Sequence, residues 1–207
     1  GADAALSDLA LPLYVDATYG SDTFCTGLST CPYASIAAAL AAAGTGNVLV
    51  VAEGTYAEDV TADRPIVGGY DSSWAAGADP AIIDGTLTFP TATGVDRFVS
   101  RVTVTGTLTF SGSASAMLHD ATVEGGATPT VTTDSGLPVL AGVVVHGPEV
   151  TSGDAVTIDV GSGGIEIHDS VLFGGIAGDG TGTAGSGGDA ITVSVSGSAA
   201  PRIRGSA

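Results

Sequence analysis

VSRVTVTG, residues 99–106, is the first of four stretches that align with one another without gaps. The other three are LHDATVEG (118–125), LAGVVVHG (140–147) and IHDSVLFG (167–174). Each begins with an aliphatic residue, passes through two mostly polar residues into an alternating run typical of a strand, and closes on glycine. Their starts lie 19, 22 and 27 residues apart. Such an internal repeat indicates a stack of similar coils.

A second run rich in valine and threonine follows each of the four stretches. These runs are GTLTF (106–110), PTVTT (129–133), AVTIDV (155–160) and AITVSV (190–195). We therefore expect two strands per coil of a parallel β-helix, in which loop insertions change the period without disturbing the stack. Residues 203–207 match the start of a fifth copy, so we expect further coils, a cap or another chain to cover this end.

The N-terminal third has a different pattern, with one predicted helix. In the run ASIAAALAAAG (34–44) the alanines favour a helix, Ile36 and Leu40 fall on one face, and Gly44 can end it. We expect this helix at about 33–43, a strand before it at 13–17 and a buried strand after it at 47–52. The following EGT (53–55) is interpreted as a turn.

Composition and charge exclude several classes of partner. The chain carries 22 acidic residues against five basic ones, all arginine, which gives a formal charge of −17. A surface of this sign repels nucleic acid and anionic lipid headgroups. The longest apolar stretch, residues 34–44, is too short to span a bilayer, so no membrane insertion is expected in this segment.

Cys25 and Cys31 are the only cysteines, and they lie in one polar loop with no histidine that would complete a metal site. A local disulfide is the simpler interpretation, and two free thiols are the alternative. Because disulfides persist in oxidising compartments, the pair favours an exported protein.

The first 85 residues resemble a known family. The run LYVDATYGSDTFCTGLSTCPYASIAAALAAAGTGNVLVVAEGTYAEDV (13–60), followed by GGYDSSW (68–74) and AIIDG (81–85), is similar to the entry segment of pectin-lyase-like β-helix proteins with a DUF1565-type domain. These are secreted bacterial proteins. The matching positions are Tyr14, Val15, Gly20, Ser21, Asp22, Pro32, Tyr33, Ile36, Leu40, Val51, Gly54, Thr55 and Tyr56.

The repeat and the resemblance together predict an all-β fold. We expect a single-stranded right-handed parallel β-helix, a solenoid, with an N-terminal capping α-helix and one domain over residues 1–207. Within it, 1–12 form an N-terminal extension, 13–56 the cap segment and 57–207 the coils. The resemblance also implies an exported protein at the extracellular or outer-membrane surface of a bacterium. It does not imply one activity, because the fold hosts polysaccharide lyases, glycoside hydrolases and adhesins.

Catalytic candidates are few. Lyases of this superfamily commonly use a lysine or arginine as base, and this chain has no lysine. Arg97 and Arg101 are weak candidates, because in an extended VDRFVSRV (95–102) their spacing of four places them on one face. Our interpretation is that both are solvated. The adjacent Asp-Asp pair that polygalacturonase-like hydrolysis uses is also missing from the chain.

Calcium is the ion that this chain's acidic loops would suit, since it prefers hard oxygen ligands. Asp16, Asp22, Asp71 and Asp84 are the candidate ligands, although Asp22 is also a common type of turn former. His119-Asp120 and His168-Asp169 occupy equivalent places in two repeats, and we interpret them as turn residues rather than a metal site.

Thr-x-Thr pairs recur at Thr86/Thr88, Thr103/Thr105, Thr107/Thr109 and Thr130/Thr132. On a flat face such a pattern would suit ice binding. We expect the copies to fall on different strands of the coil, so we interpret these threonines as strand-forming residues.

Two functions are consistent with these observations. The first is a non-enzymatic exported surface protein whose β-helix is a rigid stalk or recognition platform for a glycan or a surface protein. The alternative is the N-terminal part of a polysaccharide lyase or glycoside hydrolase whose catalytic coils lie elsewhere. A calcium-stabilised scaffold is a third, weaker interpretation.

Overall fold

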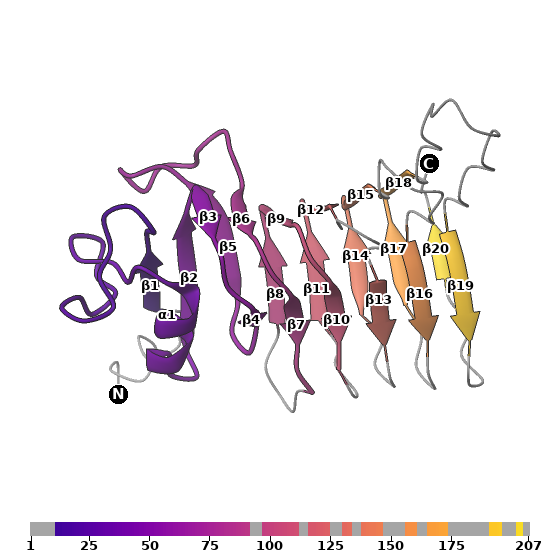
Figure 1. Ribbon diagram of the computed structural model, residues 1–207, viewed down its shortest axis with the longest axis horizontal. Helices are drawn as coiled ribbons and strands as arrows, with labels where there is room; N and C mark the ends of the chain where they lie inside the picture. Colours follow the sequence, from indigo (N-terminus) through magenta and orange to yellow (C-terminus); the bar gives the residue numbers. More distant parts are fainter. Residues whose placement is uncertain are drawn as a thin grey trace, which may run out of the picture.

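The computed structural model describes residues 11–91, 97–111, 116–124, 130–133, 138–146, 156–160, 165–173, 191–195 and 202–204. For 130–133, 156–160, 172–173, 191–195 and 202–204 it describes the backbone alone. The chain is mostly β, and its strands form three parallel sheets stacked along one long axis (Figure 1). This is a parallel β-helix-like fold.

The three sheets share a simple strand order. The first sheet contains β1 (Leu11–Val15), β2 (Asn47–Ala52), β5 (Ile66–Tyr70), β8 (Arg97–Ser100), β11 (Ala116–His119), β14 (Val139–Ala141), β17 (Glu166–His168) and β20 (Arg202–Arg204). The second contains β3 (Gly54–Tyr56), β6 (Ala81–Ile83), β9 (Val102–Val104), β12 (Thr122–Glu124), β15 (Val144–His146) and β18 (Val171–Phe173). The third contains β4 (Val60–Thr61), β7 (Leu87–Phe89), β10 (Leu108–Phe110), β13 (Thr130–Thr133), β16 (Val156–Val160) and β19 (Ile191–Val195).

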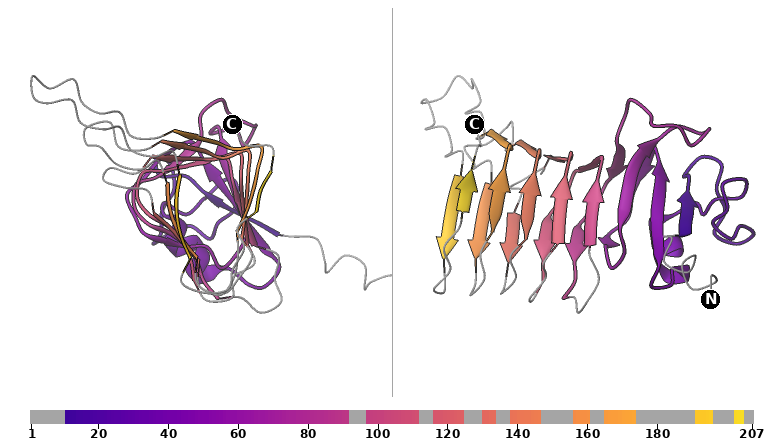
Figure 2. Two further views of the ribbon diagram at one scale, coloured as in Figure 1. Left: turned by 90° about the vertical axis from the view of Figure 1, so that its right-hand side faces the viewer. Right: turned by 180° about the vertical axis from the view of Figure 1, so that it is seen from behind.

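From β2 onward the chain visits the three sheets in turn, with one strand of each sheet per coil. Seen along the axis, the sheets form three sides around a common interior (Figure 2). The prediction of two strands per coil is therefore wrong. Each predicted first strand is in fact two strands, because the third residue of the repeat has a positive φ and turns the chain from the first sheet into the second.

The alignment of the four repeats is confirmed by the strand register. Val99, Leu118, Leu140, Ile167 and Ile203 are successive Cα partners across β8, β11, β14, β17 and β20. The second strands predicted from sequence are also found, as β10, β13, β16 and β19. The period of two sends alternate residues of each strand into the interior.

Aliphatic side chains stacked from coil to coil fill the interior. Val99, Leu118, Leu140 and Ile167 are all fully buried. In the third sheet Phe89 and Phe110 stack with ring centroids 4.7 Å apart. Burial of each such side chain stabilises the fold by about 1.5–3 kcal/mol relative to exposure.

In the part of the chain that the structure describes, one helix, α1 (Ile36–Ala42), contacts β1, β2 and β4 at the N-terminal end of the stack. Ile36 and Ala39 on its inner face are buried. The helix begins later than the predicted 33–43, because Tyr33 exchanges backbone hydrogen bonds with Tyr14 and Asp16 instead. It ends one residue earlier, with Ala43 rather than Gly44 as its C-cap.

Carboxylates from two other segments bind the start of α1. Asp22 accepts hydrogen bonds from the backbone N–H groups of Ala34 and Ser35, at 2.7 and 3.0 Å. Glu58 accepts from the N–H groups of Ile36 and Ala37, at 2.8 and 2.9 Å. The two Glu58 bonds satisfy donors that a helix leaves unpaired at its N-terminus, and the Asp22 bonds hold the residues that lead into it.

Two further boundaries differ from the expected ones. The first strand, β1, ends at Val15 rather than Ala17, because the Asp16 carboxylate accepts the N–H groups of Thr18 and Tyr19 and closes a turn. The EGT turn is reduced to Glu53, since Gly54–Tyr56 forms β3. The strand predicted at 47–52 is confirmed as β2.

Candidate functional site

The turns between the first and second sheets form a ladder of left-handed corners. Arg101, Asp120, Gly142 and Asp169 hold the third position of the four repeats, with φ of 55°, 47°, 63° and 48°. Backbone bonds link neighbouring corners: the Arg101 N–H donates to the Asp120 carbonyl at 3.1 Å, and the Gly142 N–H to the His168 carbonyl at 3.0 Å. We call this set of four residues the corner ladder.

Arg101 is the unusual member of the corner ladder. Glycine adopts positive φ at no steric cost and aspartate tolerates it, but a long side chain does so rarely. Strain of this kind persists where the surroundings impose it, and it is found preferentially at functional sites. The side chain of Arg101 is half-buried and well held: its Nη2 donates to the Gly77 carbonyl at 2.7 Å, and its guanidinium carbon lies 5.6 Å from the Tyr70 ring centroid.

The glycine pair in GGY (68–70) makes room for Arg101. A Cβ at Gly68 would lie 2.5 Å from the Arg101 carbonyl oxygen, and one at Gly69 would lie 3.2 Å from its Nη2. Gly69 also has a φ of 71°. The local sequence thus allows the arginine of one coil to pass close over the backbone of the preceding coil.

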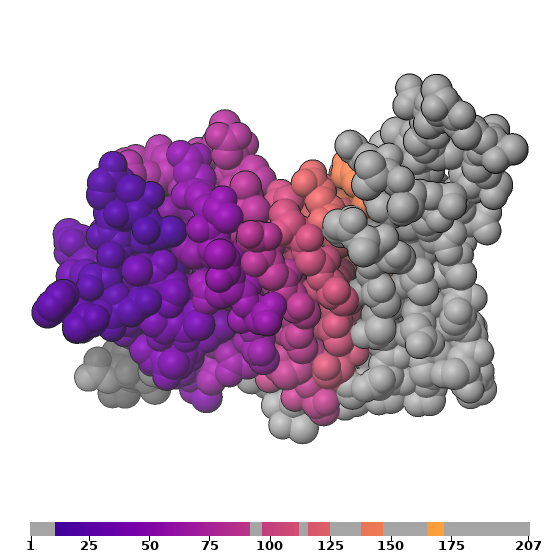
Figure 3. All heavy atoms as spheres, in the orientation of Figure 1, coloured from indigo at the N-terminus to yellow at the C-terminus, as the bar shows by residue number. Residues whose placement is uncertain are grey.

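A groove of about 420 Å³, which we call the corner groove, lies against the corner ladder. Three corners, at Arg101, Asp120 and Gly142, line its floor together with the first residues of the second-sheet strands. Its wall is the end of the segment 71–80, which joins β5 to β6. The outline of the molecule falls away beside this projecting segment (Figure 3). The lining residues are Ala78, Asp79, Pro80, Arg101, Val102, Asp120, Ala121, Thr122, Gly142 and Val144.

An aspartate turn anchors the wall where it begins. The Asp71 carboxylate accepts from the Ser73 hydroxyl at 2.7 Å, the Ser73 N–H at 2.8 Å and the Ala75 N–H at 3.0 Å. These bonds, that of the Ser73 hydroxyl foremost and that of the Ala75 N–H next, lower the pKa of Asp71.

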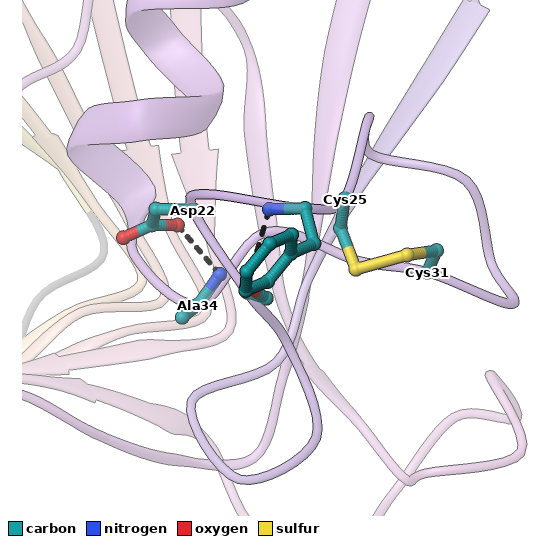
Figure 4. The surroundings of a disulfide bond; sticks show 6 residues. Asp22, Cys25, Cys31 and Ala34 are labelled. Carbon is teal, nitrogen blue, oxygen red and sulfur yellow. Dashed lines mark hydrogen bonds between the residues drawn. A yellow bond between two sulfur atoms is a disulfide. The ribbon is translucent and has the colours of Figure 1, made fainter.

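The single tryptophan, Trp74, connects the wall to the N-terminal loop. Its Nε1 donates to the Ser29 carbonyl at 2.9 Å, and its ring centroid lies 4.6 Å from the ring centroid of Tyr14. Cys25 and Cys31 form the predicted disulfide on either side of Ser29, with Cα atoms 4.9 Å apart. Figure 4 shows this bond beside the contact between Asp22 and Ala34. The disulfide is compatible with an exported protein.

Comparisons with known proteins assign the chain to no family. No protein-family model matches the chain, so the DUF1565-type assignment is not shown. No curated protein matches it either. A solved structure described as a rhamnogalacturonan lyase is similar, with a TM-score of 0.46 and 14% sequence identity over 93% of this chain. The chain spans 66% of the length of that lyase. At this level of similarity the lyase tells nothing about the chemistry of the corner groove.

The two candidate arginines do not share a strand face. Arg97 opens β8, where its Nη1 donates to the Pro90 carbonyl at 2.7 Å. Arg101 lies beyond the end of that strand, at a corner, so the premise of an extended 95–102 is wrong. Of the two, Arg101 alone lines the groove.

The four calcium candidates are each bound to protein donors. Asp16 and Asp71 close turns, Asp22 binds the start of α1, and Asp84 accepts from the Thr105 hydroxyl at 2.7 Å. Within the described residues, no three His, Cys, Asp or Glu side chains come close enough together to hold a metal ion.

Among the residues that the structure describes, no helix combines the length and apolar character needed to traverse a bilayer.

The His-Asp pairs lie at corners, as the turn interpretation predicts. His119 and His168 are two coils apart, with Ala141 as the Cα partner of both. Asp120 and Asp169 are the corner residues themselves. The His119 Nδ1 lies 3.2 Å from an Asp120 carboxylate oxygen, and the His168 Nε2 lies 3.4 Å from a Glu166 carboxylate oxygen.

Sequence reasoning missed the groove residues Asp79, Pro80 and Thr122. The sequence carries one signal for the floor of the groove. The third position of the aligned repeats is Arg, Asp, Gly and Asp, and glycine and aspartate, unlike arginine, are typical of a positive φ. No comparable signal marks the wall, because it lies in an insertion that belongs to one coil only.

Proposed function

We propose that this chain is a non-enzymatic, exported surface module that binds a glycan in the corner groove. The observation that supports this most is the placement of Arg101. It keeps a positive φ where the equivalent corner two coils on has glycine, and it directly lines the groove. The cost of this conformation, about 1–2 kcal/mol for a residue with a Cβ, favours a role for the side chain.

The lining suits a sugar, which presents hydroxyl groups at its edges and C–H groups on its faces. The guanidinium of Arg101 offers donors, the carboxylates of Asp79 and Asp120 offer acceptors, and the Thr122 hydroxyl offers both. Apolar contact comes from Pro80, Val102 and Val144. Pockets that recognise small molecules combine apolar surface with a few placed polar groups in this way.

The charge of the chain restricts the kind of glycan. A formal charge of −17 repels a polyuronate, while one arginine in the groove can pair with an isolated acidic substituent. We therefore expect a neutral glycan or one with few acidic groups. Successive corners are about 4.8 Å apart, so the groove follows the long axis and accepts a chain lengthwise.

The wider setting is part of the same proposal. We infer that the coils form a right-handed solenoid, since connections between parallel strands of one sheet have this hand almost without exception. A rod of this kind acts as a rigid stalk that holds the groove in place at the cell surface. Residues 1–207 are one domain in this proposal.

A second function, cleavage of a polysaccharide by β-elimination, is favoured by one observation: Arg101, a base candidate, lines the groove. Against it, the guanidinium already donates to the Gly77 carbonyl and lies over Tyr70. A glycan screen with absorbance monitoring separates the two functions, since elimination forms an unsaturated product and binding does not.

The test measures retention of the protein on immobilised neutral and acidic polysaccharides. Asp120→Gly removes a groove carboxylate while glycine accepts the corner conformation. Asp169→Gly is the matched control, because Asp169 has nearly the same φ but does not line the groove. We expect retention of the native protein, weaker retention of D120G and unchanged retention of D169G. No retention on any glycan, equal losses in both variants, or unsaturated product from the native protein would contradict the proposal.

A further inference from the structure

Threonines line up across the outer face of the third sheet, away from the corner groove. Within β7 and β10 the buried side chains are Leu87, Phe89, Leu108 and Phe110. Alternation therefore directs Thr88 and Thr109 outward. The Cα register of β4, β7, β10 and β13 places four threonines in one row: Thr61, Thr88, Thr109 and Thr132.

A second row runs parallel to the first, two residues earlier in each strand. Thr86 and Thr107 precede β7 and β10. The hydrogen bond from the Leu87 N–H to the Thr107 carbonyl, 2.9 Å long, extends the register of the two strands to these threonines. Further along the stack Thr130, Thr157 and Thr192 are successive Cα partners. We call the two rows together the threonine face: Thr61, Thr86, Thr88, Thr107, Thr109, Thr130, Thr132, Thr157 and Thr192.

The expectation that the copies fall on different strands of the coil is wrong for three of the four Thr-x-Thr pairs. Thr86/Thr88, Thr107/Thr109 and Thr130/Thr132 stack on one sheet, and only Thr103/Thr105 belongs to another. The coils have three strands, and each pair recurs at the third strand of its coil.

The threonine face is regular in two directions. Strands in the third sheet pair without a register shift from β4 to β19. From β7 to β13, threonines therefore repeat at about 4.8 Å from strand to strand and at about 6.6 Å along each strand. Beyond β13 the first row continues with Asp159 and Ser194. Threonine is also β-branched, so its side chain has few rotamers and holds its hydroxyl and methyl groups in place.

Five hydroxyl groups of this face belong to side chains that the structure describes. Those of Thr61, Thr86, Thr88, Thr107 and Thr109 make no hydrogen bond to the part of the chain that the structure describes. Thr61 is exposed and the other four are partly exposed. A hydroxyl with no protein partner is free to donate to and accept from water.

We propose that the threonine face binds the surface of ice. The oxygen atoms of ice repeat in two dimensions, and a regular array of hydroxyl groups is what such a surface requires of a partner. A crystalline polysaccharide has a repeat too, but binding its sugar rings calls for a row of aromatic side chains. In β4, β7 and β10 the outward positions are threonines. Ice is uncharged, so the formal charge of −17 does not oppose it.

The test uses the full chain in two measurements: thermal hysteresis and incorporation of the fluorescently labelled protein into a growing ice crystal. The double variant Thr88→Tyr/Thr109→Tyr places bulky rings in the centre of the face while keeping residues that favour strands. Thr55→Tyr is the matched control, because Thr55 is an exposed strand threonine of the second sheet.

We expect incorporation and hysteresis from the native protein and from T55Y, and loss of both from the double variant with an unchanged melting temperature. Thr88→Val/Thr109→Val keeps the shape of the face and tests the hydroxyl groups separately, and it should retain part of the activity. Absence of ice incorporation by the native protein overturns the inference. Equal activity of the native protein and the Thr88→Tyr/Thr109→Tyr variant also overturns it. So does retention of the native protein and T55Y on crystalline cellulose or chitin if the double variant is not retained.

Discussion

At the scale of single residues, the corner ladder explains the geometry of the candidate site. The third position takes a positive φ in each of the four aligned repeats, and the chain fills it with Arg101, Asp120, Gly142 and Asp169. Only Gly142 meets this demand without strain. A substitution at the third position of a repeat therefore tests directly whether the chain has a left-handed corner there.

Gly142→Ala tests the conformation of the corner. A Cβ at this φ of 63° is strained and would lie 3.1 Å from an Asp120 carboxylate oxygen. We expect a loss of about 1–2 kcal/mol in the free energy of unfolding, measured by urea denaturation. Gly46→Ala is the control, since a Cβ there meets no atom within 4 Å. Equal stability of G142A and the native protein would show that the corner is not left-handed.

Asp71 gives a prediction about pH. Its hydrogen bonds favour the charged carboxylate, so its pKa in the folded chain lies below the unfolded value. The turn is thus most stable above the unfolded pKa, and this stability is lost as the pH falls through the folded pKa. A carbon chemical-shift titration should place the Asp71 midpoint below that of aspartate in an unstructured peptide. Ser73→Ala, which removes the largest cause, should move the midpoint upward, and an unmoved midpoint would contradict this assignment.

At the scale of elements, the segment 71–80 and the loop closed by Cys25 and Cys31 act together. The disulfide closes the loop that carries Ser29, Ser29 accepts from Trp74, and Trp74 belongs to the groove wall. Sequence reasoning found the disulfide and the helix but not this connection. The bond between Trp74 and Ser29 joins residues 45 positions apart, which no local pattern reports.

Removal of the disulfide should therefore be visible at Trp74. Cys25→Ser/Cys31→Ser frees the loop, and we expect about 2 kcal/mol lower stability together with a red shift of the emission of this single tryptophan. Reductant should produce the same shift in the native protein and no further shift in the double variant. Emission identical to the native protein in both cases would mean that the loop does not hold the wall.

At the scale of the whole molecule, the repeat predicted the stack of coils but not its cross-section. Val99, Leu118, Leu140 and Ile167 align in the sequence and are neighbours in the sheet, since one buried residue per coil fixes the register. The third strand per coil was missed because each repeat was interpreted as a single strand, whereas its third residue, such as Arg101, turns the chain from the first sheet into the second. The groove was missed because its wall and its floor come from different coils.

Binding in the corner groove is the central functional claim, and amide chemical-shift mapping tests it most directly. The polysaccharide retained most strongly would be cut to short oligosaccharides and titrated into the isotope-labelled protein. The largest shifts are predicted at Arg101, Asp120, Thr122 and Gly142, with none at Thr88 or Thr109. Shifts centred on the third sheet, or none at saturating oligosaccharide, would contradict the account.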